Sequence, residues 1–525
     1  MAGASPADLH QLEADFLELR EVHDRVRLAE ARGLDASQGR ARYSVLYRQL
    51  TDAYTSSDDA GLGEADRRAR RTMIRLLQDG TLPAPRADAA PSLGTAVQDC
   101  DYDPALLATG DEGLARLQER LYACYSQAAR QVAFEGGSYD RLTILEMTAR
   151  EDDPRRRRAA FLALRPLFQS VNGDGGPGSP YRTMLPLSAA RWRQGGSPID
   201  RNLDALGIPR DQLEPWLLAI LEAWRQLAAG AELEPWDHAY FGNAAGRRLG
   251  DALPRERLRP LNDAFYRSLG ADVDALNIHY DLESRPGKTA VAFTDFGARP
   301  QWRDGRSSPG EPWIFATYRA GGLGNLNELL HETGHAIHIA GIRTRPAYAD
   351  WPDSDTFTEA LAEVQSLESY EPSWQREWLG REASLADNLR AKYSGIALDV
   401  AWGLFELRLH RDPSLDPNQL WTELTSRYLH VRPHPELSWW ARRGQLLNSP
   451  GYMMNYALGA ILAADMRARC RELRGPFTNR DSGYYAWLSE RLFRHGLEKP
   501  SRDVLRDFLG RPPSPEAILA DMQRR

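Results

Sequence analysis

The sequence Leu323–His335 reads LGNLNELLHETGH and ends in the pattern H-E-x-x-H. Leucines at positions 323, 326, 329 and 330 recur at the spacing of one helical face, and Gly341 offers a helix stop. Because residues four apart lie above one another on a helix, His331 and His335 point two imidazoles at one place. Glu332 lies about 100° around the helix, within reach of a metal-bound water. We therefore predict a buried helix that carries two ligands of a catalytic zinc ion.

A second helical stretch can supply the third protein ligand. Asp353–Val364 reads DSDTFTEALAEV, and its Asp/Ser cluster is typical of a helix start. Glu359 and Glu363 are four residues apart, so both carboxylates face one way. One can bind the metal while the other accepts a hydrogen bond from a ligand histidine, which fixes the ring orientation. Two histidines, one glutamate and a water form the open coordination of a catalytic zinc. The competing interpretation is a helix with two incidental histidines.

Composition limits the class of protein. The chain has 525 residues, of which 42% are hydrophobic, enough for a large core and too many for one minimal domain. The net charge of −7 gives no general attraction to nucleic acid. Its three cysteines form no C-x-x-C pair, which argues against a cysteine metal site and favours a reducing compartment. The first residues lack a secretory pattern, and no apolar run approaches membrane-spanning length. We expect a soluble, cytoplasmic protein.

The two helical stretches resemble known metallopeptidases. The run His331–His338, HETGHAIH, is similar to the thimet-type pattern H-E-F-G-H-x-x-H. The run Glu359–Val364, EALAEV, is similar to E-A-I-G-D-V of angiotensin-converting enzyme, at a similar distance after the first histidine. Both resemble the gluzincin zinc metallopeptidases, in particular the group of angiotensin-converting enzyme, thimet oligopeptidase and oligoendopeptidase F.

This resemblance implies a role for each residue of the two motifs. His331, His335 and Glu359 bind one zinc ion, and Glu332 is the general base and acid. Glu363 takes the place of an outer carboxylate that holds a ligand histidine, with Glu here in place of Asp.

A third segment resembles the substrate-binding strand of the group. Arg285–Phe293 reads RPGKTAVAF and is similar to the thimet-type run R-x-G-K-R-x-G-A-F. The small and β-branched residues of Thr289–Thr294 predict a strand, with Trp313–Tyr318 as its neighbour. The resemblance implies that the substrate backbone adds to this strand. The residues in contact with the substrate would then be Ala290, Val291 and Ala292. An ordinary core strand is the alternative.

A tyrosine pair follows near the C-terminus. Pro450–Gly459 reads PGYMMNYALG and resembles the family run G-Y-x-x-x-Y. In the family these tyrosines bond the scissile carbonyl, a task that suits a phenol because it donates while neutral. We assign Tyr456 to the oxyanion and Tyr452 to substrate, with the reverse possible; two core tyrosines are the alternative. Members carry a histidine some ten residues before the oxyanion tyrosine, whereas Gly444–Asn448 here contains none.

These resemblances imply the fold and the function. The fold is mostly α-helical, with an N-terminal helical lobe (1–270) and a catalytic lobe (271–525) that flank a deep central channel, and one short β-sheet beside the zinc helix. Leucine spacing between Leu9 and Gly80 predicts two or three long helices there. The function is that of a zinc-dependent peptidase for short unfolded oligopeptides, of oligopeptidase or dipeptidyl-carboxypeptidase type, acting as a monomer or homodimer without nucleic acid or membrane.

Two other functions remain open. The first is a catalytically impaired protein that contains zinc and binds peptides without cutting them. The absence of the family histidine is the observation that favours it. An intact Glu332 argues against it, since a pure binding protein has no need of a base beside the metal. The second possibility is a peptidase dedicated to one biosynthetic peptide.

Overall fold

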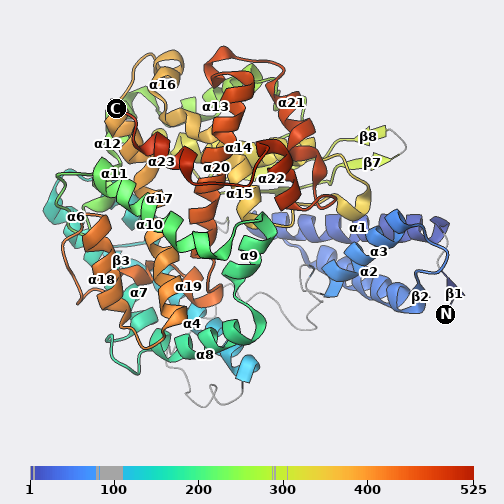
Figure 1. The fold of residues 1–525 in the computed structure, drawn as a ribbon, viewed down its shortest axis with the longest axis horizontal. Helices are drawn as coiled ribbons and strands as arrows, with labels where there is room; N and C mark the ends of the chain where they lie inside the picture. The colour runs from blue at the N-terminus through green and yellow to red at the C-terminus, as the bar shows by residue number, and fades with distance from the viewer. Residues whose placement is uncertain are drawn as a thin grey trace. The chain divides into compact units, whose positions relative to one another are not determined.

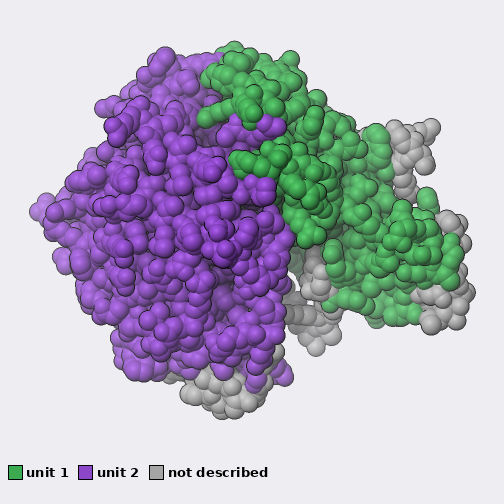
Figure 2. All heavy atoms as spheres, viewed as in Figure 1, with its two compact units in different colours: residues 1–92, 253–366, 470–511 green, residues 93–252, 367–469, 512–525 purple. Residues whose placement is uncertain are grey.

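The computed structural model describes residues 2–3, 6–78, 82, 110–285, 288, 291–303 and 306–525. Its residues group into two compact units, coloured separately in Figure 2. The first unit comprises residues 1–92, 253–366 and 470–511, and the second comprises residues 93–252, 367–469 and 512–525. Each unit is therefore assembled from three stretches of chain. The lobe boundary at residue 270 stays a prediction.

The chain is mostly helical, as predicted (Figure 1). The helices of the first unit are α1 (Pro6–Ala31), α2 (Ser37–Ser56), α3 (Glu64–Gln78), α13 (Leu258–Ser268), α14 (Leu323–Gly341), α15 (Asp355–Ser366), α21 (Tyr484–Arg491) and α22 (Ser501–Leu509). Those of the second are α4 (Gly110–Arg130), α5 (Arg141–Arg150), α6 (Pro154–Leu162), α7 (Arg165–Asn172), α8 (Pro180–Gly195), α9 (Pro198–Leu206), α10 (Leu213–Leu227), α11 (His238–Gly242), α12 (Ala244–Leu249), α16 (Pro372–Leu379), α17 (Leu385–Arg411), α18 (Pro417–Tyr428), α19 (Gln445–Asn448), most of α20 (Met453–Arg474) and α23 (Glu516–Met522). Short 3-10 helices are η2 (Arg210–Gln212), η3 (Gly250–Ala252), η4 (Arg255–Arg257), η5 (Pro346–Tyr348), η6 (Leu367–Tyr370), η7 (Trp439–Arg442), η8 (Phe477–Asn479) and η9 (Phe493–His495).

The three N-terminal helices pack against one another, as the leucine spacing predicts (Figure 1). Phe16 and Leu19 of α1 are fully buried, and they share one apolar cluster with Leu46 of α2 and Met73 of α3. Each helix thus contributes apolar side chains to one cluster, although α1 also buries Arg20 and Asp24 and α3 buries Arg70. The prediction of two or three long helices in this region is confirmed.

One three-stranded sheet lies beside α14, as predicted. Its order is β5 (His279–Asp281), β9 (Pro312–Phe315) and β6 (Phe293–Phe296). Strand β9 runs parallel to β5 and antiparallel to β6, with Thr294 opposite Ile314. Two-stranded pairs add β1 (Ala2–Gly3) with β2 (Ser57–Asp58), β3 (Val132–Phe134) with β4 (Gly137–Tyr139), and β7 (Gln301–Arg303) with β8 (Arg306–Ser308). The sequence did not indicate these pairs.

Strand β6 begins later than predicted. It starts at Phe293 instead of Thr289. Val291, which is 59% exposed, and the partly buried Ala292 precede the strand. Ala290 lies outside the described residues.

The connection before β6 is held by a buried lysine. The Lys288 ammonium donates hydrogen bonds to the backbone oxygens of Asp281 (2.7 Å), Glu283 (2.9 Å) and Ala316 (2.6 Å). It also lies 3.0 Å from the Asp281 carboxylate, which Arg285 contacts as well. These oxygens lie at and beyond the ends of β5 and β9, so the lysine joins the two strand ends. Sequence periodicity carries no sign of such a contact.

The second unit has an aromatic core. Trp402 of α17 stacks on Trp421 of α18 with ring centroids 4.9 Å apart, and Trp421 meets Trp439 edge-on at 5.0 Å. All three side chains are fully buried. Large aromatic side chains supply much of the apolar surface that a core of this size buries.

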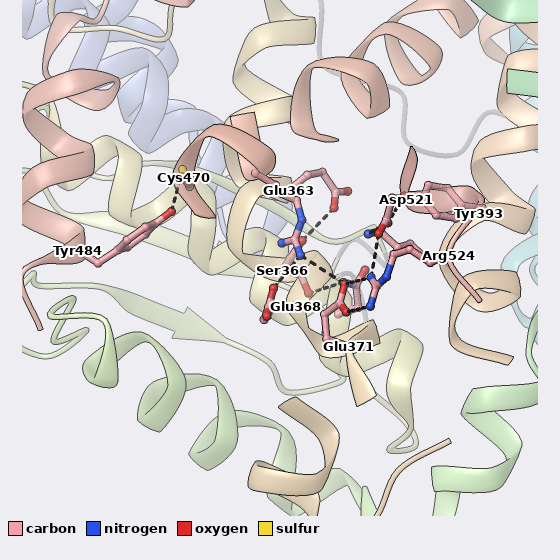
Figure 3. A network of polar contacts seen from close by, with 12 residues as sticks. Glu363, Ser366, Glu368, Glu371, Tyr393, Cys470, Tyr484, Asp521 and Arg524 are labelled. Atoms are coloured by element: carbon pink, nitrogen blue, oxygen red, sulfur yellow. Dashed lines mark hydrogen bonds and ion pairs between the residues drawn. The ribbon is translucent and has the colours of Figure 1, made fainter. Parts of the chain in front are cut away.

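The last helix of this unit, α23, is tied down by charged side chains (Figure 3). Asp521 accepts a hydrogen bond from Lys392 at 2.6 Å and another from the Tyr393 hydroxyl. Arg524 lies 2.9 Å from Glu371. Lys392 and Glu371 are buried, so each charge depends on its partner for compensation.

Cys470 is a buried free cysteine, and Cys124 is disulfide-bonded. The cytoplasmic location stays a prediction. In the described part of the chain, no helix combines the length and the apolar character needed to cross a membrane.

A buried carboxylate holds the segment that leads into α20. Glu406 of α17 is fully buried, and its two oxygens accept the backbone N–H groups of Gly451 (2.8 Å) and Met453 (3.2 Å). Burial raises the pKa of this carboxyl to about 8, although both hydrogen bonds lower it. Arg408 and Arg411, on the same helix, pair with Glu214. The native state therefore prefers the protonated carboxylic acid.

The pKa of Glu406 predicts how stability varies with pH. Between pH 4.5 and 8 the native state keeps this proton while the unfolded state has lost it. The free energy of unfolding therefore falls as the pH rises through this window, by at most about 1.4 kcal/mol per pH unit, and levels off above pH 8. Glu406→Gln, which mimics the protonated form, is expected to flatten this decline in thermal melts. Glu423→Gln, at an exposed position of α18, is the control. Equal declines in all three proteins would contradict the prediction.

Candidate metal centre

Helix α14 carries the H-E-x-x-H motif in a buried position. Leu326, Leu329 and Leu330 are fully buried on it, as the leucine period predicts. The Tyr266 hydroxyl donates to the backbone oxygen of Leu330, and the Tyr485 hydroxyl donates to another α14 carbonyl at 3.1 Å. The helix ends at Gly341, the predicted stop. Apolar packing and these hydrogen bonds hold α14, which carries the motif, in place within the first unit.

Helix α15 brings the glutamates to this helix. The Ser354 hydroxyl accepts the Phe357 N–H at 3.2 Å and so caps α15 at the predicted Asp/Ser cluster. The Asn327 amide of α14 donates to the Ser366 backbone oxygen of α15 at 2.9 Å. Gly334 lets the two helices approach, because a Cβ atom there would lie 2.6 Å from the Ala362 oxygen.

The three predicted ligand atoms converge on one point. The Nε2 atoms of His331 and His335 lie 3.1 Å apart. Oε2 of Glu359 lies 3.3 Å from the first and 3.7 Å from the second. A tetrahedral zinc with ligand distances of about 2.1 Å has ligand atoms about 3.4 Å from one another. The three residues therefore fit one zinc ion, and in the described part of the chain they are the one such group.

The charges at this point favour a cation. Burial lowers the pKa of the His331 imidazole, but the carboxylates of Glu363 and Glu359 outweigh burial and raise it well above its usual range. Burial likewise raises the pKa of Glu359, and the imidazoles of His335 and His331 outweigh it and lower this pKa far below its usual range. Both shifts reflect carboxylates that remain ionised beside the rings. A divalent cation bound between the histidines and Glu359 would compensate the negative charge of these carboxylates.

The two glutamates of α15 face different atoms of His331. Oε1 of Glu363 lies 3.2 Å from the Nδ1 atom, on the side of the ring away from the convergence point. Its Oε2 accepts a hydrogen bond from Ser366 at 2.9 Å (Figure 3). Glu359 faces Nε2 instead. Glu359 thus lies on the Nε2 side of the His331 ring, where the three ligand atoms converge, and Glu363 lies on the opposite, Nδ1 side.

Glu332 points toward the neighbouring sheet. It is 6% exposed, and the Thr294 hydroxyl of β6 lies 2.7 Å from its Oε2 and 2.9 Å from its backbone oxygen. Trp351 packs against the His335 ring, with centroids 5.5 Å apart. The sequence identified neither Thr294 nor Trp351 as part of the site. Thr294 carries only the signal of a β-branched strand residue, which says nothing of its hydroxyl.

The other predicted residues lie elsewhere. Val291 and Ala292 precede β6 in the first unit. Tyr452 and Tyr456 belong to the second unit, at the start of α20, with ring centroids 5.6 Å apart. The Gln445 amide donates to the Tyr456 oxygen at 3.4 Å. The structure therefore assembles His331, Glu332, His335, Glu359 and Glu363 in one unit, and the roles of the strand residues and tyrosines stay predictions.

Comparison with known proteins identifies the family that the sequence resembles. Residues 273–524, which include all five site residues of α14 and α15, match the sequence profile of Peptidase family M3. The resemblance to the gluzincin metallopeptidases is confirmed. Among curated proteins, no sequence matches this chain. The family match supports a metallopeptidase and implies a divalent metal.

Solved structures share the fold over nearly the whole chain. An M32 carboxypeptidase from Deinococcus radiodurans R1 is 14% identical, with a TM-score of 0.59 and coverage of 97% of both chains. A putative oligoendopeptidase F is 18% identical, with a TM-score of 0.56 and coverage of 99% of this chain and 96% of that one. A putative oligoendopeptidase F from Bacillus anthracis str. Ames is 15% identical, with a TM-score of 0.57 and coverage of 93% and 84%. At these identities the likeness shows the fold alone.

The close approach at Gly334 predicts the effect of one methyl group. Gly334→Ala places a Cβ atom against the Ala362 backbone, so α14 and α15 must separate, at a cost of about 1–3 kcal/mol. We expect a lower melting temperature and weaker metal binding. Gly324→Ala on the same helix is the control, because a Cβ atom there meets nothing within 4 Å. Equal metal affinity in both variants would contradict this account of the site.

The contact between Glu363 and Nδ1 of His331 predicts a graded loss of metal. Glu363→Gln removes the charge that orients the ring, and such outer contacts are worth about 10- to 100-fold in metal affinity. Glu363→Asp keeps the charge on a shorter side chain, so we expect an intermediate affinity. Competition with a chromophoric chelator measures both. Unchanged zinc affinity in Glu363→Gln would show that the contact does not orient the ligand.

Proposed function

We propose that this protein is a zinc-dependent peptidase that hydrolyses peptide bonds of short, unfolded oligopeptides. The observation that carries the proposal is the convergence of His331, His335 and Glu359 at distances of 3.1–3.7 Å, with a buried carboxylate, Glu332, on the same helix. Three protein ligands leave a coordination position open, as catalytic zinc sites do.

In this proposal His331, His335 and Glu359 hold one zinc ion, and Glu363 keeps the His331 ring in the orientation that presents Nε2. The ion supplies a Lewis acid that polarises the scissile carbonyl. The ligand residues stay in place during the reaction. Their packing on α14 and α15 means that little reorganisation is needed when a substrate arrives.

Glu332 moves the proton. Its carboxylate accepts a proton from the attacking water and later passes it to the leaving amine. A buried position suits this role, because a base surrounded by few waters transfers its proton to the reacting groups. The adjacent position of Glu332 in the motif places it beside the ligands without making it one.

The remaining predicted residues complete the proposal. Tyr456, with Tyr452 beside it, donates a hydrogen bond to the oxyanion. Ala290, Val291 and Ala292 bind the substrate backbone as an added strand. The lobes at 1–270 and 271–525 with a channel, the monomeric or dimeric state and the cytoplasmic location also remain proposals. Oligopeptidase and dipeptidyl-carboxypeptidase action stay open, and the similar structures are named as both oligoendopeptidases and a carboxypeptidase.

Glu332→Gln tests the role of the base. Gln keeps the shape but cannot accept the proton, so kcat should fall by about 10²–10⁴-fold or more while zinc stays bound. His335→Ala should instead lose the zinc. Metal content by mass spectrometry and cleavage of a mixed peptide library, with and without chelator, measure both.

The wild-type result separates the alternatives. Stoichiometric zinc with chelator-sensitive cleavage supports the peptidase, and the cut positions distinguish the two modes of action. Cleavage of a single sequence in the library would favour a dedicated peptidase. Zinc without any cleavage would favour a peptide-binding protein. Native turnover by Glu332→Gln would refute the assignment of the base.

A further inference from the structure

A threonine on the neighbouring sheet contacts the carboxylate of Glu332. The Thr294 hydroxyl lies 2.7 Å from Oε2 of Glu332, although the two residues are 38 positions apart in the sequence. Within the described residues, the Glu332 carboxylate forms its hydrogen bond with this hydroxyl. A buried carboxylate held by one strong donor has a defined orientation.

The strand that carries Thr294 is itself held firmly. Thr294 lies opposite Ile314 in the antiparallel pair of β6 and β9. One residue earlier, the Phe293 ring stacks on the Phe315 ring of β9 with centroids 4.8 Å apart and an angle of 8°. Threonine is β-branched, so its side chain has few allowed rotamers on a strand. The sheet therefore fixes the backbone of Thr294 and limits the positions that its hydroxyl can take.

The hydroxyl has one proton and two acceptors within reach, since the Glu332 backbone oxygen lies 2.9 Å away. That carbonyl also accepts the helical N–H four residues later, as every interior helix carbonyl does. Oε2 of the carboxylate is the nearer of the two acceptors, at 2.7 Å from the hydroxyl. The proton of Thr294 therefore goes to Oε2. The bond leaves Oε1 of Glu332 as the oxygen that receives a proton.

We propose that Thr294 is a positioning residue that fixes the Glu332 carboxylate by binding Oε2, so that Oε1 faces the attacking water. The inference rests on the proposed peptidase function. It adds to that function a residue that acts through Glu332. The alternative is that the hydroxyl only joins the sheet to α14. Such a structural contact would contribute to stability and leave turnover unaffected.

Two variants separate these roles. Thr294→Val keeps the shape and removes the hydroxyl, whereas Thr294→Ser keeps the hydroxyl. For Thr294→Val we expect kcat to fall by about 10- to 100-fold, with KM within about twofold of wild type and zinc content unchanged, because a misdirected base slows the chemical step without weakening binding. Thr294→Ser should recover most of kcat. The control is Thr425→Val, which removes a buried hydroxyl that bonds a helix carbonyl in the second unit and should leave kcat unchanged.

A double variant decides whether Thr294 acts through Glu332. In Glu332→Gln protein, the residual rate no longer depends on a base at this position. Adding Thr294→Val should then change it by less than about twofold, since the two losses are not additive when one residue acts through the other. A further fall as large as in the wild-type background would overturn the proposal. So would a Thr294→Ser variant as slow as Thr294→Val, or a fall in zinc content or melting temperature that accounts for the lost rate.

The outcome for Thr294 is distinguishable from that for the peptidase. If zinc-loaded wild-type protein cleaves no peptide, the proposed function fails, and the role of Thr294 fails with it. If wild type cleaves peptides and Thr294→Val cleaves them at the same kcat, the peptidase stands and the positioning role alone is overturned.

Discussion

The close contact of α14 with α15 at Gly334 is the constraint on which the metal centre depends. Helical periodicity alone brings His331 and His335 together, because both belong to one helix. The third ligand comes from a second helix, so its distance from the histidines is set by how near α15 can lie. With 2.6 Å between the Ala362 oxygen and a Cβ atom at position 334, only glycine permits the observed spacing.

Several ionisable groups lie close together where α14 and α15 meet. Glu359 and Glu363 approach the same imidazole from opposite sides, at 3.3 Å and 3.2 Å. Ionised carboxylates removed from water are costly unless they meet opposite charge. A bound divalent cation offsets that cost for Glu359, while the ring of His331 and the hydroxyl of Ser366 do so for Glu363. A binding site whose groups are held in advance in this way loses little freedom when the ion arrives.

The sequence predicts those parts of the structure that depend on local spacing. Helices α14 and α15, the end of α14 at Gly341 and the pairing of His331 with His335 follow from residues three or four apart and from helix start and stop residues. Spacing left open which glutamate of α15 binds the metal, and the resemblance to the metallopeptidases assigned Glu359. The contacts of Lys288 could not be predicted, because its ammonium binds backbone oxygens as far apart in the sequence as Asp281 and Ala316. Thr294 was missed for the same reason: strand propensity fixes its backbone, while its partner lies on a helix far along the chain.

The residues with proposed roles in the reaction come from both units. The proposed metal ligands, the proposed base and Thr294 all belong to the first unit. The tyrosines belong to the second, where Glu406 holds the backbone at Gly451 and Met453, on either side of Tyr452. A buried carboxylate that binds backbone N–H groups gives this segment one conformation, as Thr294 does for Glu332. In the proposal, the residues that hold the metal and move the proton thus come from one unit, and the tyrosines come from the other.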